Sequence, residues 1–205
     1  MVGFILLKMA REIEIKFLVA DTKALARRLR ASGFRLVTRR THEMNVLYDL
    51  PGLPLRQHGE ILRLRKYGDR WMLTHKSKGT TQRHKSRQEL ETAVTDGASL
   101  DGILRALGFA PSFRYEKFRS EWTDGQGHVV IDETPIGTVA EIEGRPRWID
   151  RTARLLGIPQ SSYITLSYGA MFDEWKLRTG SPAEEMTFAA VGVAGKVPKN
   201  KKLSS

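Results

Sequence analysis

A short run of alternating charged and apolar residues near the N-terminus carries the residue types that could do chemistry. Residues 11–17 read Arg-Glu-Ile-Glu-Ile-Lys-Phe. In an extended strand Glu12, Glu14 and Lys16 therefore share one face, and the apolar side chains share the other. Two carboxylates at this spacing stand about 7 Å apart along a strand, so both can approach one hard cation from the same side. An ordinary half-buried strand with a solvated charged face would show the same alternation.

Charged residues recur in this in-phase pattern along much of the chain, with acids and bases in equal number. The acids are Glu12, Glu14, Glu89, Glu91, Asp132, Glu141 and Glu143. The bases are Lys16, Arg63, Arg65, Lys76, Arg87, Lys117 and Arg119. Carboxylates suit hard divalent cations, whereas guanidinium and ammonium groups hold phosphate oxygens. Phosphate binding alone needs no acids, and metal binding alone needs no arginines, so the mixture indicates a metal–polyphosphate complex.

The elements that must position these residues are strands interrupted by amphipathic helices. The alternation predicts strands over residues 11–17, 34–49, 60–66, 71–77, 86–94, 112–122, 128–133 and 138–143. Apolar stripes and capping residues predict helices over residues 22–32, 99–107, 148–156 and 161–177. Each helix needs an apolar surface to cover, and the apolar strand faces supply it. We therefore expect an α+β fold in which a closed antiparallel β-barrel has a polar, charged lumen and helices packed on its outside.

Composition limits the classes of protein that remain. The 205 residues suit one substantial domain, and the absence of cysteine excludes disulfides, thiolate metal sites and a cysteine nucleophile. The net charge of +11 indicates an anionic partner. Residues 1–10 are apolar but too short to span a bilayer, and they lack the early basic region of a signal peptide. We expect a soluble, cytoplasmic protein that does not associate with membranes, with Met9 as an alternative start.

Taken in order, the charged motifs resemble those of the CYTH superfamily, the triphosphate tunnel metalloenzymes. The resemblance covers residues 11–168. Its motifs are Glu12-Ile13-Glu14-Ile15-Lys16, Arg63-Leu64-Arg65, Thr74-His75-Lys76, Arg87-Gln88-Glu89-Leu90-Glu91, Lys117-Phe118-Arg119, Asp132 and Glu141-Ile142-Glu143-Gly144. The family fold is an eight-stranded antiparallel tunnel. Its members include class IV adenylyl cyclases, thiamine triphosphatases and inorganic triphosphatases, all of which bind a triphosphate with Mg²⁺ or Mn²⁺.

The resemblance implies roles for the charged residues. The metal ligands would be Glu12, Glu14, Asp132, Glu141 and Glu143. The phosphate ligands would be Lys16, Arg63, Arg65, Lys76, Arg87, Lys117 and Arg119. Glu89 and Glu91 would hold a second metal or orient the bases. Residues at which proton transfer or charge stabilisation would occur are Lys16, Lys76, Glu89 and Glu91.

We expect an N-terminal extension over residues 1–10, a tunnel domain over 11–180 and a disordered basic tail over 181–205, the last because of its lysines. The favoured function is metal-dependent hydrolysis of an inorganic or organic triphosphate. Two alternatives stay open: adenylyl cyclisation of ATP, and a non-catalytic module that binds polyphosphate or nucleic acid. The charged faces carry few aromatic residues, so nucleic acid is not expected as a specific ligand. A homodimer is left open, and Ser167 and Tyr168 are expected only to pack within a helix.

Overall fold

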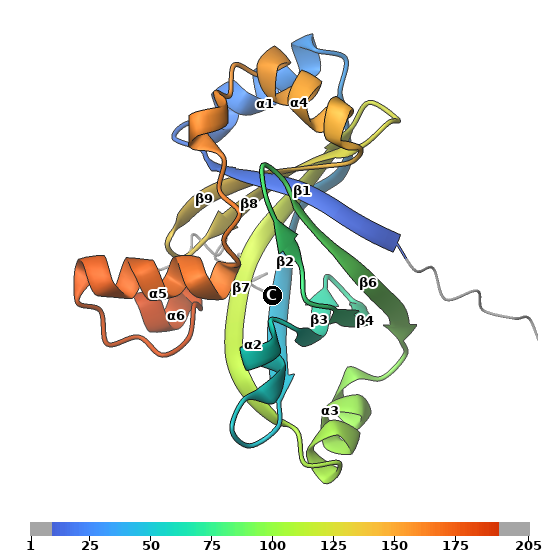
Figure 1. Ribbon diagram of the computed structural model, residues 1–205, viewed down its shortest axis with the longest axis vertical. Coiled ribbons are helices and arrows are strands. Elements are labelled where there is room, and N and C mark those ends of the chain that lie inside the picture. The colour runs from blue at the N-terminus through green and yellow to red at the C-terminus, as the bar shows by residue number, and fades with distance from the viewer. Residues whose placement is uncertain (1–9, 193–205) are drawn as a thin grey trace, which may run out of the picture.

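A closed antiparallel barrel forms the centre of the computed structural model, which describes residues 10–192 (Figure 1). Neighbouring strands run in the order β1, β9, β8, β7, β2, β3, β4 and β6, and β6 pairs again with β1 to close the ring. Closure leaves no free edge among these eight strands. The strands are β1 (Ala10–Leu18), β2 (Arg35–Asp49), β3 (Ile61–Tyr67), β4 (Arg70–Lys76), β6 (Lys85–Val94), β7 (Ala110–Thr123), β8 (His128–Thr134) and β9 (Gly137–Glu143). The two-residue strand β5 (Thr80–Thr81) pairs with β6 outside the ring.

The apolar strand faces point out of the barrel, and helices cover them at two places. At one end, α1 (Thr22–Ala31) and α4 (Pro146–Leu155) bury the outward residues of β1, β7, β8 and β9, among them Ile15, Ile131 and Ile142. At the other end α3 (Gly97–Ala106) covers the outward faces of β2 and β3, where Leu104 packs with Tyr48 and Leu64. Figure 1 shows these helices at opposite ends of the barrel. The expected inside-out barrel is therefore confirmed.

Three short segments differ from the elements expected from the sequence. The loop before β3 contains a helix, α2 (Pro54–His58), whose first amides Leu55 and Arg56 donate to the Asp49 carboxylate. The expected helix over 161–177 begins only at α5 (Tyr168–Thr179), after a single 3₁₀ turn at Gln160–Ser162. Between them Ile164 forms two backbone hydrogen bonds with Lys16. This pairing holds the chain extended and delays the helix.

The segment from 181 to 192 is folded, so the disordered tail does not begin at residue 181. Met186 is fully buried and its backbone pairs with β7 through Arg114 and Glu116. Helix α6 (Phe188–Val191) follows, capped by the Thr187 hydroxyl. The lysines that suggested disorder all lie beyond residue 192, whereas residues 181–192 make apolar contacts to α5 and β7. Ala10 begins β1; the rest of the expected N-terminal extension (residues 1–9) and the tail beyond residue 192 lie outside the described residues.

Leu64 provides a test of the direction in which the strand faces point. It is 2 % exposed beneath α3, so Leu64→Ala should lower the free energy of unfolding by about 2–5 kcal/mol by leaving a cavity. Leu177 lies on α5 with 88 % of its surface exposed, and Leu177→Ala should change the same quantity by less than about 0.5 kcal/mol. Urea denaturation of both variants measures the difference. Equal stability of the two variants would contradict the outward position of Leu64.

Candidate active site

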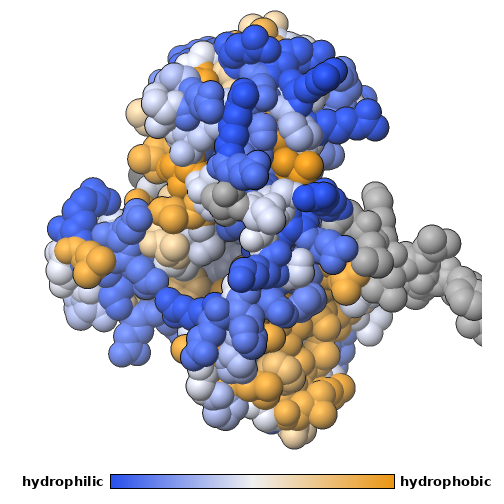
Figure 2. All heavy atoms as spheres, viewed as in Figure 1, coloured by the Kyte–Doolittle hydropathy of each residue, from blue (hydrophilic) through white to orange (hydrophobic). Residues whose placement is uncertain are grey.

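The lumen of the barrel contains a cavity of about 710 Å³. In Figure 2 this face of the molecule is hollowed near its centre, and hydrophilic side chains surround much of the hollow. Every strand of the barrel except β8 contributes charged residues to its wall, because the lumen faces are the polar faces of the strands. These residues are Glu12, Glu14, Lys16, Asp49, Arg63, Lys76, Lys85, Arg87, Lys117 and Glu141.

Six of the residues predicted from the sequence lie in the barrel but do not line this cavity: Arg65, Glu89, Glu91, Arg119, Asp132 and Glu143. Most of them are bonded to residues that do line it. Arg119, for example, donates to Glu141 at 2.7 Å, and Glu89 lies 3.0 Å from the Lys76 ammonium. Hydrogen bonds and ion pairs thus join thirteen of the fourteen predicted residues, together with Glu43, into one network with an inner wall and a supporting layer; Glu143 lies beside them on β9.

The first lysine of the network, Lys16, is bound by two carboxylates on neighbouring strands. Its Nζ lies 2.5 Å from Glu14 Oε1 and 3.3 Å from Glu141 Oε1. The strand register places Lys16 opposite Glu141 and Glu14 opposite Glu143. Burial alone would lower the pKa of Lys16, but the carboxylates of Glu14 and Glu141 outweigh it and raise that pKa above its ordinary value. The ammonium is therefore fixed as a cation.

Glu12 is held in the same way by bases from the two strands on its other side. Lys76 Nζ lies 2.6 Å from Glu12 Oε1, and Arg87 Nε donates to Glu12 Oε2 at 3.0 Å. Burial would raise the pKa of Glu12, yet the positive charges of Lys76 and Arg87 dominate and lower it to about 2. Glu12 is thus a permanent anion at the wall of the cavity.

Glu143 lies in the opposite electrostatic environment. Burial raises its pKa to about 7, and the nearby carboxylates of Glu12, Glu141 and Glu14 add to this effect. The corner between β1 and β9 therefore holds more negative charge than its lysines neutralise. A raised carboxylate pKa within a group of acids marks a place where an added cation would be stabilised.

Asp132 is buried completely and is surrounded by hydrogen-bond donors. Lys117 Nζ lies 2.9 Å from it, Arg119 donates to both of its oxygens at 2.8 and 2.6 Å, and the Tyr168 hydroxyl donates at 2.6 Å. In this arrangement Asp132 orients the bases. Tyr168 does more than the helix packing expected for it, because its hydroxyl reaches the network from the first turn of α5.

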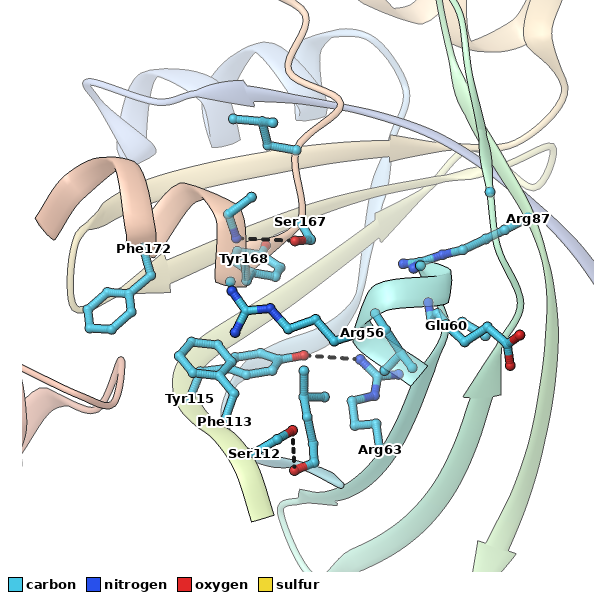
Figure 3. Close-up of a pocket in the computed structure, with 18 of the residues that line it drawn as sticks. Arg56, Glu60, Arg63, Arg87, Ser112, Phe113, Tyr115, Ser167, Tyr168 and Phe172 are labelled. Carbon is cyan, nitrogen blue, oxygen red and sulfur yellow. Dashed lines mark hydrogen bonds between the residues drawn. The ribbon is translucent and has the colours of Figure 1, made fainter. Parts of the chain in front are cut away.

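The paired arginines of β3 are oriented by the acids of β6. Arg65 donates to Glu91 at 2.6 Å, and Glu91 also accepts from the Thr74 hydroxyl at 2.9 Å. Arg63 donates to the Tyr115 hydroxyl at 3.3 Å, and its guanidinium lies 4.0 Å from Glu89. Figure 3 shows Arg63 and its bond to Tyr115 beside the cavity. Of the two roles left open for Glu89 and Glu91, this geometry favours orientation of the bases.

Two charged residues of the lumen, Glu43 and Lys85, escaped prediction from the sequence. Glu43 on β2 is fully buried, with Lys117 at 3.4 Å and Arg65 and Arg119 each at 3.8 Å. Burial would raise its pKa, but Lys117, Arg119 and Arg65 lower it well below the ordinary range. Its neighbours at positions 41 and 45 are uncharged, so no alternation of charges marked it.

Lys85 is the second residue that prediction from the sequence missed. It lines the cavity two residues before Arg87 on β6, opposite Glu14. Burial lowers the pKa of its amine to about 8, and the positive charges of Arg87 and Lys16 act in the same direction. Its place in phase with Arg87, Glu89 and Glu91 was a signal that could have identified it.

The acidic corner of β1 and β9 fits a divalent cation by its chemistry. Its donors, on Glu12, Glu14, Glu141 and Glu143, are carboxylate oxygens, which Mg²⁺ and Mn²⁺ prefer, and burial together with the neighbouring carboxylates raises the pKa of Glu143. Among residues 10–192, no three acidic or histidine side chains converge at metal-binding distance. Lys16 and Lys76 lie against these carboxylates instead.

Fold and lumen together define the chain as a closed barrel with an internal, charge-lined binding cavity. Residues 10–146 match the family model of the CYTH domain, and the chain belongs to that family. A Methanocaldococcus jannaschii protein, provisionally named an adenylate cyclase, is 24 % identical over 133 residues, which cover 64 % of this chain and 75 % of that protein.

Solved structures with the same fold agree with this assignment. A Vibrio parahaemolyticus protein, also provisionally named an adenylate cyclase, has a TM-score of 0.70 at 20 % identity, covering 81 % of this chain and 99 % of its own. A Hippeastrum protein provisionally named an adenylyl cyclase, for which a dominant triphosphatase activity is described, has a TM-score of 0.59 at 21 % identity, covering 80 % and 95 %. No helix between residues 10 and 192 has the length and apolar character needed to cross a membrane.

Removing the charge of Glu43 tests whether it holds the basic residues together. Glu43→Gln leaves three buried cations with one anion fewer, and it should lower the free energy of unfolding by about 3–5 kcal/mol. Glu133→Gln is the matched control, because Glu133 pairs with Arg40 at 2.9 Å on the exposed surface, where such a change costs about 1 kcal/mol or less. Chemical denaturation measures the free energy of unfolding of both variants. A loss for Glu43→Gln no larger than for Glu133→Gln would show that Glu43 does not stabilise the network.

Proposed function

We propose that this protein is a divalent-metal-dependent enzyme that hydrolyses a triphosphate. CYTH proteins act on triphosphates, and enzymes of the family generally depend on a divalent metal. The observation that carries the proposal is that the carboxylates of Glu12, Glu14 and Glu141 line the same cavity as the bases Lys16, Arg63, Lys76, Arg87 and Lys117. The description of the Hippeastrum structure supports hydrolysis over cyclisation.

In this proposal the basic residues bind the phosphates and the acidic corner binds the metal. Lys16, Arg63, Lys76, Arg87 and Lys117 project into the cavity and supply the charge and hydrogen-bond donors that phosphate oxygens require. Arg65 and Arg119 do not line the cavity and add positive charge behind these five bases. Glu12, Glu14, Glu141 and Glu143 would hold Mg²⁺ or Mn²⁺, which would neutralise phosphate charge as a Lewis acid. Asp132 stays with its bases and sets their direction.

Hydrolysis of a triphosphate needs mainly positioning and charge neutralisation. A water oxygen attacks the terminal phosphorus, the bond from that phosphorus to the bridging oxygen breaks, and orthophosphate leaves. The fixed cations Lys16 and Lys76 stabilise the charge on the equatorial and leaving oxygens. Glu89 holds Lys76 and Glu91 holds Arg65 from behind the cavity wall, and a carboxylate that lines the cavity would accept the proton of the attacking water.

Adenylyl cyclisation is the second candidate, favoured by the name of the M. jannaschii relative. In that reaction the ribose 3′-oxygen attacks the α-phosphorus and pyrophosphate leaves. The same bases and acids would serve it, since both reactions displace a phosphate chain. The third candidate function is a module that binds polyphosphate or nucleic acid without catalysing a reaction.

The reaction products distinguish the three candidate functions. Purified protein incubated with ATP, tripolyphosphate or thiamine triphosphate, each with Mg²⁺ or Mn²⁺, should release orthophosphate from at least one of them. Ion-exchange chromatography of the products is the measurement. Formation of cyclic AMP and pyrophosphate from ATP would show that the protein is a cyclase and not a hydrolase. Binding of a triphosphate without any turnover would favour the non-catalytic binding module.

The metal assignment is tested at Glu143. Glu143→Gln keeps the size of the side chain and removes one carboxylate, so it should weaken Mn²⁺ binding by about tenfold or more. Glu133→Gln removes a carboxylate on the outer face of β8 and should leave Mn²⁺ binding unchanged. Calorimetric titration of the substrate-free protein with Mn²⁺ gives the affinities, and activity against metal concentration gives a second readout. Equal Mn²⁺ affinities in the two variants would place the metal elsewhere.

A further inference from the structure

The positive charge of this chain is not explained by the lumen. Lys8 and four lysines beyond residue 192 lie outside the described residues, which leaves 29 bases and 23 acids in residues 10–192 and a net charge of +6. Inside the barrel, the seven predicted bases and Lys85 are matched by the seven predicted acids and Glu43. The excess of positive charge therefore lies on the outer surface.

Helices α1 and α4 carry an excess of this size. Their one acidic residue is Asp150, and their seven bases are Lys23, Arg27, Arg28, Arg30, Arg147, Arg151 and Arg154. All seven bases are exposed, as are Arg35 and Arg145 beside the helices. The two helices lie side by side at one end of the barrel (Figure 1), where Arg28 donates to the Leu156 carbonyl at 2.8 Å. We call the surface that these nine bases form the basic cap, and hydrophilic side chains cover most of this end in Figure 2.

Bases recur at the same spacing on both helices of the basic cap. Residues 23, 27 and 30 on α1 and residues 147, 151 and 154 on α4 each follow the pattern i, i+4, i+7. Each set therefore forms a stripe about two turns long on the exposed side of its helix. Like charges at this spacing destabilise a helix by about 0.2–0.5 kcal/mol per pair, whereas an acid in the middle of each stripe would stabilise it. An arrangement that costs helix stability has a physical reason if an anionic partner neutralises both stripes.

Neutral groups hold several of these arginines in place. The Arg30 guanidinium lies 5.0 Å from the centre of the Trp122 ring, and Arg154 donates to the backbone carbonyl of Asp150 at 3.3 Å. The bond from Arg28 to the Leu156 carbonyl is of the same kind. Such contacts restrict the side chains and leave their charge in place.

Acidic side chains neutralise little of the basic cap. Within residues 10–192, Arg151 is the one base of the nine that has an acidic partner, Asp124 at 3.7 Å. The Asp150 carboxylate of α4 is bound from outside the cap, by Arg83 at 2.7 Å and His84 at 2.9 Å. The charge of the cap is therefore available to a partner.

The composition of the basic cap favours phosphate groups on a macromolecule. Eight of its nine bases are arginines, and the planar guanidinium matches the geometry of phosphate oxygens better than an ammonium group does. A membrane is a poorer partner, because a helix that lies in a bilayer surface must expose its apolar face. Here the apolar faces of both helices, among them Leu29 and Ile149, are fully buried in the core.

Single-stranded nucleic acid is also a poorer partner than a duplex. Proteins that bind single strands combine positive charge with aromatic rings on which the bases stack. The aromatic residues at this end of the barrel, Phe34, Trp122 and Trp148, are each at most 5 % exposed. A duplex keeps its bases stacked inside and presents its phosphates outside, so it needs only the charge that the cap provides.

We infer that the basic cap binds the phosphodiester backbone of double-stranded nucleic acid, without preference for base sequence. This surface is separate from the lumen, and the inference does not depend on the proposed function. Lysine and arginine contacts to the backbone release counterions from the duplex, so the affinity falls steeply with salt concentration. Backbone contacts alone carry no information about sequence.

Fluorescence anisotropy with labelled duplexes of about 20 base pairs tests the inference on the full chain. The Kd should rise on the order of 10³-fold between about 50 mM and 200 mM salt, as expected for about six phosphate contacts. A duplex of scrambled sequence should bind equally well, and a single strand of the same length should bind more weakly. DNA and RNA duplexes of one sequence are compared, and the tighter complex identifies the kind of nucleic acid. Absence of duplex binding at the lower salt concentration would overturn the inference.

A pair of variants with equal net charge assigns the binding to the basic cap. Arg27→Gln combined with Arg147→Gln removes one base from each stripe, and it should weaken duplex binding by about tenfold and lower the salt dependence by about two contacts. Arg70→Gln combined with Arg178→Gln is the matched control, because both arginines are exposed on β4 and α5, away from the cap. The control should bind the duplex like the parent. Equal losses in both variants would assign the binding to net charge and overturn the inference.

Two further measurements separate the remaining explanations. Anionic vesicles of phosphatidylglycerol that bind more tightly than the duplex at equal salt would make the cap a membrane surface and overturn the inference. Turnover of tripolyphosphate should be the same in both variants. A loss of kcat/KM at low salt in the cap variant, without duplex binding, would show that the cap only steers anionic substrates. Failure to turn over any triphosphate would refute the proposed function and leave the duplex measurements unaffected.

Discussion

Buried charge is the constraint on which this structure depends. Placing a carboxylate or an ammonium ion away from water costs several kcal/mol unless an opposite charge and hydrogen bonds replace the lost hydration. The lumen satisfies this requirement by pairing most of its acids with bases. Asp132 has three donors from β7 and α5, and Glu12 has two from β4 and β6. The exception is Glu143, where burial and the nearby carboxylates raise the pKa to about 7 and where we propose that a cation binds.

This constraint explains why the hydrophobic core lies outside the barrel. A lumen filled with charges cannot also bury apolar residues, so the opposite faces of the same strands must do so. Helices α1 and α4 at one end and α3 at the other supply the covering surface. The outward faces therefore supply the apolar burial, and the lumen faces form the cavity. The lumen still affects stability, because its buried charges must stay paired.

The C-terminal segment connects the two faces. Helix α5 reaches into one end of the lumen, where Tyr168 joins the charged network through its hydroxyl and stacks on Tyr115 through its ring. Residues 181–192 then fasten this helix to β7 through the buried side chain of Met186. The apolar end of the lumen accommodates the buried rings of α5. The same helix thus closes the barrel end and shapes what can be bound there.

Alternation along single strands was enough to determine the faces of the barrel. Because side chains alternate strictly along a strand, Glu12, Glu14 and Lys16 had to share a face opposite to Ile13 and Ile15, and the same rule separated Leu64 from Arg63 and Arg65. The charge on those faces, together with apolar stripes on the helices, predicted a polar lumen. These conclusions needed only local geometry, so the sequence by itself carried them.

Contacts between strands distant in the chain were decided by tertiary structure alone. Glu43 has no charged neighbour at a spacing of two, and it joins the site because β2 pairs with both β3 and β7. Tyr168 meets Asp132 because Ile164 pairs with Lys16 and directs α5 into the barrel end. The rings of Phe113 and Tyr115 on β7 contact those of Phe172 and Tyr168 on α5, and no local pattern in the sequence relates them. Periodicity reports which way a side chain points on its own strand, whereas strand register and helix docking determine what it meets.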